Sequence, residues 1–98
     1  MLTSKQKKFL KKEAHHLKPV FQIGKSGLHH TVIEELNAVL EARELIKVNF
    51  LQNTLEDPKE AGEQVAEKIG AEVVQVIGNV LVLYKESENN KTIELPRA

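Results

Sequence analysis

The stretch FQIGKSGLHHTVIEEL, residues 21–36, decides how the chain is organised. An apolar run that begins at Val20 ends at Ile23, two glycines then enclose a lysine and a serine, and apolar residues at helical spacing follow. Apolar runs bounded by glycine favour strands, and closely spaced glycines mark turns. We therefore expect a strand over 20–23, a tight turn over Gly24–Gly27 and a helix that starts at Leu28.

This helix is expected to reach about Ala42, because apolar residues recur with the period of one helix face. They are Leu28, Val32, Ile33, Leu36, Val39 and Leu40. Thr31 and Glu34 have the spacing of a capping box and would form one if the regular part of the helix began late.

A lysine-rich helix is predicted before the quoted stretch. Thr3 and Gln6 have capping-box spacing, and helical periodicity continues to about His16, before Pro19 stops it. At about 100° per residue, apolar and cationic side chains fall on opposite arcs. The apolar arc holds Phe9, Leu10, Ala14 and Leu17, and the cationic arc holds Lys5, Lys7, Lys8, Lys11, Lys12 and Lys18.

After the quoted stretch, residues 45–51 alternate apolar and polar side chains, as a strand with one buried face does. A third helix follows. Asp57 is placed to be its N-cap, Pro58 its first residue and Gly70 its stop. Its expected buried stripe is Ala61, Val65, Ala66 and Ile69.

The C-terminal part contains a hairpin signal, because the apolar runs 73–77 and 80–84 flank the two-residue turn Gly78-Asn79. The tail from about residue 86 is polar, with order expected only in part, around Ile93 and Leu95. The predicted order is therefore α-β-α-β-α-β-β. Strand-helix-strand steps favour parallel crossovers and the hairpin adds an antiparallel strand, so we expect an α/β fold with a four-stranded mixed sheet packed with helices.

Size and composition limit the possibilities further. A chain of 98 residues is enough for one compact domain with one core, expected over 1–98. It contains no cysteine, which rules out disulfides and thiolate zinc sites and fits the cytoplasm. We expect no membrane association, because no apolar stretch has the length of a signal h-region or of a membrane span.

The net charge of zero conceals a strong segregation of charge along the chain. Residues 1–30 carry seven lysines against the single Glu13, a balance of +6, and residues 31–98 carry a balance of −6. The local field attracts phosphate groups, so this asymmetry points to a polyanionic partner. The alternative is a lysine-rich helix that is merely solvated.

Several kinds of chemistry are not supported by the sequence. The GKS triplet lacks the leading glycine of a Walker loop, because Pro19 stands at that position. In the pairs His15-His16 and His29-His30 the side chains diverge by about 100° on a helix, so neither pair chelates a metal. Carboxylates occur on expected polar helix faces, where solvation explains them, at Glu34, Glu35, Glu41, Glu60, Glu63 and Glu67. We predict no enzymatic activity, no metal and no cofactor.

The turn Gly24–Gly27 has the chemistry of an anion clamp. Glycines admit positive φ and remove Cβ atoms that would hold a phosphate backbone away, and amides at the following helix start carry partial positive charge. Lys25 adds a full charge. A GXXG loop that holds four backbone nucleotides is known in KH domains, although the tetrapeptide alone is more often an ordinary tight turn.

The combination of KPVFQIGKSGL, VIEELNAVLEARELIKV, VIGNVLVLYK and IELPR closely resembles the small bacterial YhbY-type proteins of the CRM domain family, named for chloroplast RNA splicing and ribosome maturation. The resemblance extends from about Leu2 to Arg97. It implies a fold similar to the C-terminal domain of translation initiation factor three. It also implies binding of ribosomal RNA during maturation of the large ribosomal subunit. The acidic half of the chain adds basic ribosomal proteins as further candidate partners.

The predicted RNA-binding residues come from two sources. The resemblance carries over the loop residues Gly24, Lys25, Ser26 and Gly27, and charge counting adds Lys5, Lys8, Lys11, Lys12 and Lys18. Lys47, on a polar strand position, is a weaker candidate. A competing interpretation is a protein-binding module whose lysine-rich helix docks on an acidic protein.

Overall fold

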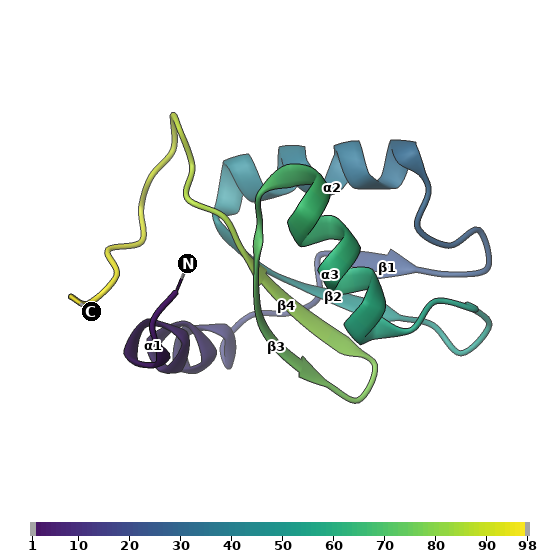
Figure 1. Ribbon diagram of the computed structural model, residues 1–98, viewed down its shortest axis with the longest axis horizontal. Coiled ribbons are helices and arrows are strands. Elements are labelled where there is room, and N and C mark those ends of the chain that lie inside the picture. The colour runs from purple at the N-terminus through teal and green to yellow at the C-terminus, as the bar shows by residue number, and fades with distance from the viewer. Residues whose placement is uncertain (1, 98) are drawn as a thin grey trace.

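The computed structural model describes residues 2–97 as a four-stranded sheet with helices on both faces (Figure 1). The predicted α/β class and element order are confirmed. The elements are α1 (Ser4–Ala14), β1 (Phe21–Ile23), α2 (His30–Arg43), β2 (Leu45–Phe50), α3 (Pro58–Ile69), β3 (Glu72–Ile77) and β4 (Val80–Tyr84).

The strands lie in the order β1-β2-β4-β3. β1 pairs in parallel with β2, while β4 is antiparallel to both of its neighbours. The final strand of the hairpin therefore lies in the interior of the sheet, between β2 and β3. A mixed sheet follows, as the two strand-helix-strand steps and the hairpin predict.

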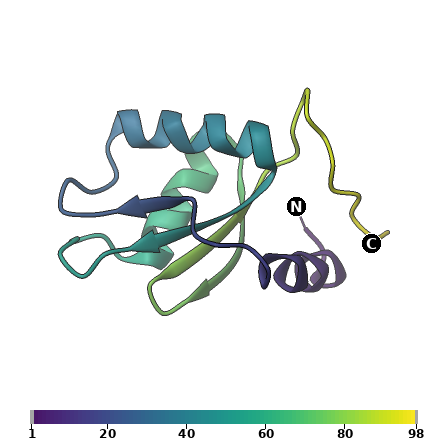
Figure 2. The same ribbon diagram turned by 180° about the vertical axis from the view of Figure 1, so that it is seen from behind.

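Helices α2 and α3 cover one face of the sheet (Figure 2). The alternation of the strands places every second side chain on this face, where it packs against the apolar stripes of both helices. The resulting core consists of Ile23, Leu36, Leu40, Ile46, Val48, Phe50, Ala61, Val65, Ala71, Leu81 and Leu83.

Helix α1 and the C-terminal tail cover part of the other face. The second cluster consists of Leu10, Ala14, Leu45, Val74, Val82 and Tyr84, with the half-buried Ile93 and Leu95 of the tail packed against it. The Gln6 Nε2 atom donates to the Pro96 carbonyl at 3.0 Å, which ties the tail to α1. Within residues 2–97 no helix has both the length and the apolar character that a bilayer crossing requires.

The tail is fixed by two carboxylates, those of Glu41 in the last turn of α2 and of Glu44, the residue between α2 and β2. Glu44 is fully buried, and its carboxylate accepts the backbone N–H groups of Ser87, Thr92 and Ile93 at 2.7–2.8 Å. Burial raises the pKa of Glu44, but these donors outweigh it and the pKa lies below its usual value. Glu44 adopts a φ of 65°, which is uncommon for a residue with a Cβ.

The expectation that solvent alone explains the carboxylates on the helix faces is wrong for Glu41, which binds the tail. Its carboxylate accepts the Ser87 hydroxyl at 2.7 Å and the backbone N–H groups of Glu88 and Asn89 at 3.0 Å. The Glu88 N–H, then the Ser87 hydroxyl and the Asn89 N–H, lower its pKa from 4.5 to about 2. The tail is thus held by contacts that its polar composition does not reveal.

Helix boundaries follow their capping signals with one exception. The Thr3–Gln6 capping box forms, with both hydrogen bonds at 3.1 Å, and Asp57 accepts the Glu60 N–H at 3.2 Å. The expected box of Thr31 and Glu34 is wrong, because α2 starts at His30 after the N-cap His29, which makes no side-chain cap. Helix α1 also ends at Ala14, two residues before the expected His16.

Candidate nucleic-acid interface

The GKSG loop is a closed turn at the end of β1. The Gly27 N–H donates to the Gly24 carbonyl at 3.0 Å, so the exposed Lys25 and Ser26 stand at the tip. Gly27 has a φ of 72°, which a residue with a Cβ rarely adopts, whereas Gly24 is not in the positive region. Only the second glycine of the motif is therefore required by backbone conformation.

A carboxylate from the β2–α3 connection occupies the base of this loop. The Glu56 Oε2 atom accepts the Leu28 N–H at 2.7 Å, and a Cβ built on Gly27 would lie 2.7 Å from the same oxygen. This corrects the expectation that the amides after the loop are free to bind an anion, since Leu28 already has an acidic partner. The groups of the loop that stay open to an anion are the Lys25 and Ser26 side chains and the amides at the tip.

The lysines of α1 form a separate cationic surface. Lys5, Lys8 and Lys12 of α1 are exposed, as is Lys18 four residues after its end, and Lys11 is half-buried. Leu10 and Ala14 turn the other side of the helix into the sheet. No acidic residue lies in the first turn, and Lys11 and Lys12 lie in the last. The predicted division of the helix into an apolar and a cationic arc is present.

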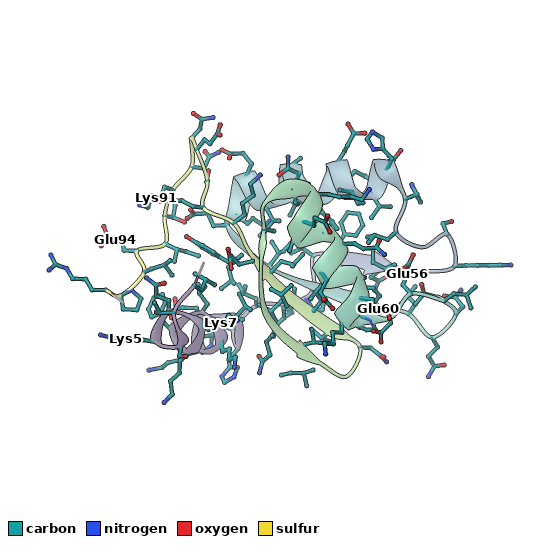
Figure 3. All side chains as sticks on the ribbon, in the orientation of Figure 1. Lys5, Lys7, Glu56, Glu60, Lys91 and Glu94 are labelled. Atoms are coloured by element: carbon teal, nitrogen blue, oxygen red, sulfur yellow. The ribbon has the colours of Figure 1, made fainter. Side chains whose placement is uncertain are left out.

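The two predicted parts of the site are not adjacent. Helix α1 lies at one end of the longest axis, which spans 39 Å, and the loop between β1 and α2 lies at the other end (Figure 1). Figure 3 shows Lys5 and Lys7 at the α1 end and Glu56 and Glu60 toward the loop end. The loop therefore does not extend the cationic helix directly, although the two lie close in sequence.

Polar strand residues lie between these two parts. The register pairs Gln22 with Asn49, and Lys47 lies two residues before Asn49 on β2. Their neighbours Val48, Phe50 and Ile23 belong to the core under α2 and α3, so the polar side chains belong to the other face. We call the part of this sheet face that α1 leaves uncovered the open strip. It consists of Gln22, Lys47, Asn49, Gln75, Ile77 and Val80.

The open strip adds residues that the sequence prediction missed. The sequence makes Lys47 a weaker candidate and does not single out Gln22 or Gln75. The available signal was a single polar residue inside an apolar run, as in FQI and VVQVI. Such a residue marks the sheet face that is not fully buried.

The acidic residues lie mainly on the opposite side of the molecule. Helix α3 packs on the face away from α1 and exposes Glu60, Glu63 and Glu67 to solvent. Among residues 2–97 no three histidine or carboxylate side chains converge in a way that could hold a metal ion. The exposed lysines distinguish the α1 side from the α3 side, which exposes these carboxylates.

The chain is similar to known proteins in sequence and in fold. The family model described as the CRS1 / YhbY (CRM) domain matches residues 2–85. A Bacillus subtilis protein named probable RNA-binding protein YqeI is 53% identical over 96 residues, covering 98% of this chain and 100% of its own. A Haemophilus influenzae protein named RNA-binding protein is 43% identical over 96 residues, covering 98% of this chain and 96% of its own. The solution structure of a hypothetical protein from Staphylococcus aureus superposes with a TM-score of 0.80 at 51% identity, covering 98% of this chain and 100% of that one.

Proposed function

Because the chain belongs to the CRS1/YhbY (CRM) domain family, we propose that it is a non-catalytic RNA-binding protein. The proposed surface combines the α1 lysines, the open strip and the tip of the GKSG loop. In this proposal its RNA is ribosomal, bound in the cytoplasm while the large ribosomal subunit is assembled.

One observation carries the proposal: the sheet face that α2 and α3 leave free is cationic at one end, polar along its middle and cationic again at the loop. Lys12 and Lys18 mark one end, Lys47 lies in the open strip, and Lys25 marks the other end. Lysines serve as point charges toward phosphate, and polar side chains between them leave room for a sugar-phosphate backbone. A strand of RNA along this face would meet positive charge at both ends and at Lys47 between them.

The acidic residues support the same orientation. Residues 31–98 carry a balance of −6, and the exposed carboxylates of α3 lie behind the sheet. These charges repel phosphate groups, so a polyanion is directed to the α1 side. Three carboxylates depart from this pattern. Glu13 lies on α1 and Glu94 lies in the tail beside it, while Glu56 lies at the loop, where its carboxylate accepts the Leu28 N–H.

The electrostatic part of the proposal has a measurable consequence. About four to six phosphate contacts correspond to a slope of roughly −3 to −4 in log K against log salt, at about 0.7 per single-strand contact. Titration of the protein with a ribosomal RNA fragment at several salt concentrations gives this slope. Tight binding with a slope near zero would contradict a mechanism based on charge.

The identity of the RNA is tested in cells. The protein is crosslinked to its RNA, recovered under denaturing conditions, and the attached RNA is sequenced. Enrichment of large-subunit ribosomal RNA is expected, and it should disappear for a variant with Lys5, Lys8 and Lys12 changed to Glu. Recovery of proteins alone, with no RNA above background, would favour the competing interpretation of a protein-binding module.

A further inference from the structure

A small cavity lies where the end of α1 meets the open strip. Its volume is about 170 Å³. The buried Ala14 and Val82 form its bottom, and Val80 and Ile77 form one side. The lining is therefore largely apolar in the middle of a surface that is otherwise cationic and polar.

The rim of the cavity has the opposite character. Lys11 and His15 of the α1 end, Lys47 of β2 and the Gln75 amide of β3 surround the apolar bottom. An apolar ring with a phosphate attached to it fits such a site, since the ring covers the bottom while the phosphate meets the lysines. The Gln75 side chain offers one donor group and one acceptor, as recognition of a base edge requires.

The exposure of Ile77 is a second reason to expect a ligand in this cavity. It is 59% exposed, although it is a large apolar residue at the end of a strand. Its neighbour Val76 faces the other side of the sheet, because Val76 pairs with the core residue Leu81 and Ile77 pairs with Val80. Ile77 thus presents apolar surface beside the cationic rim.

We propose that this cavity binds one unstacked, single-ring nucleobase of the RNA, with the flanking phosphates on Lys11 and Lys47. The size of the cavity supports a single ring, since an apolar cavity of about 150 Å³ is known to hold benzene. This inference rests on the proposed function, because it assigns a base-binding subsite within the RNA-binding surface. It predicts a preference for pyrimidines that a purely phosphate-directed surface would not have.

The inference is tested by removing bases while keeping phosphates. The wild-type protein is titrated at low salt with a ten-nucleotide oligouridine, with oligoadenosine and with an abasic ribose-phosphate strand of equal length. We expect oligouridine to bind roughly five- to tenfold more tightly than the abasic strand, which corresponds to the burial of several tens of Å² of apolar surface. Oligoadenosine should fall between the two.

Two neighbouring substitutions provide a matched pair. Ile77→Thr removes apolar surface from the cavity, whereas Val76→Thr makes a similar change on the opposite face, and both keep a β-branched residue in the strand. Ile77→Thr should weaken oligouridine binding by roughly threefold and leave abasic binding unchanged, as expected for about 25 Å² of lost apolar contact. Val76→Thr should change neither affinity, and circular dichroism confirms that both variants are folded.

Equal wild-type affinity for oligouridine and the abasic strand would overturn the base-binding subsite while leaving the phosphate-binding surface intact. An equal effect of Ile77→Thr on both strands would also overturn it. Absence of salt-sensitive binding to all three strands would instead be a failure of the proposed function, so the two failures are distinguishable.

Discussion

The two faces of the sheet are built on different principles. The α2/α3 face is covered by two helices and buries eleven side chains of one cluster. The α1 face is covered at one end by α1 and the tail, and at the other end it leaves Gln22, Lys47 and Asn49 within reach of solvent. The same strands supply both faces, because successive side chains point to opposite sides.

This difference separates stability from function. Apolar burial is the dominant favourable term in folding, so the α2/α3 face supplies most of the stability. The open part of the other face contributes little to the core, and its polar and cationic residues are free to bind. Substitution of residues that anchor the covered parts should therefore change the free energy of unfolding. Substitution of exposed residues on the α1 side should change RNA affinity.

The largest expected effect concerns the buried anchor of the tail. Glu44→Gln keeps the size of the side chain but replaces one of two acceptor oxygens by a donor, which then faces backbone N–H groups. We expect a loss of about 2–4 kcal/mol in the free energy of unfolding, measured by urea denaturation, because a buried donor is left without its partner. Glu35→Gln on the exposed side of α2 is the control and should cost less than about 0.5 kcal/mol. Equal stability of the two variants would show that the Glu44 contacts do not hold the fold.

The same anchors make stability depend on pH. The folded pKa values of Glu41 and Glu44 are both lowered, that of Glu41 to about 2. Their contribution is therefore present above the unfolded pKa near 4.5 and is lost as the pH falls through the folded values. Unfolding followed between pH 6 and pH 2 should show a steeper loss of stability for the wild type than for a Glu41→Gln variant. Parallel curves would contradict this role of the Glu41 contacts.

A comparable effect on binding is expected from the lysines of α1. Changing Lys5, Lys8 and Lys12 together to Glu removes three phosphate contacts and adds repulsion, without touching the apolar arc of the helix. The affinity for a ribosomal RNA fragment should fall by more than about 2 kcal/mol at low salt, and the loss should shrink as salt rises. Circular dichroism should show a folded protein. An unchanged affinity would exclude α1 from the RNA-binding surface.

The loop should contribute less than the helix. Lys25→Ala removes one charge from the tip while keeping the Gly24–Gly27 hydrogen bond, and it should make the slope of log K against log salt shallower by about 0.7. Gly27→Val is a poorer test, because the positive φ of Gly27 and the nearby Glu56 carboxylate would strain the fold as well. A slope identical to that of the wild type would place the loop outside the interface.

The smallest effect is expected on the far side of the molecule. Changing Glu60, Glu63 and Glu67 to Gln removes acidic charge behind the sheet, so RNA affinity should stay nearly unchanged or rise slightly. The variant is titrated with the same RNA as the lysine reversal. If it loses binding while the lysine reversal keeps it, the two faces have been assigned the wrong way round.

The sequence predicted the fold better than it predicted the arrangement of the site. Periodicity, Thr3, Asp57 and Gly70 act locally, so the element order and two of the three helix starts follow from them. The separation of α1 from the loop, the Glu56 contact at Leu28 and the Glu44 anchor of the tail depend on how distant segments pack. A pattern read along the chain contains no direct signal for such contacts.

The central claim is that RNA binds on the α1 side of the sheet, and mapping backbone amide shifts during titration with a ribosomal RNA fragment tests it most directly. We predict that shifts at saturating RNA concentrate in α1, in Lys47 and Asn49 of the open strip, and in Lys25 and Ser26 of the loop, while the outer side of α3 stays unperturbed. Shifts concentrated on the exposed sides of α2 and α3, with α1 unchanged, would contradict it.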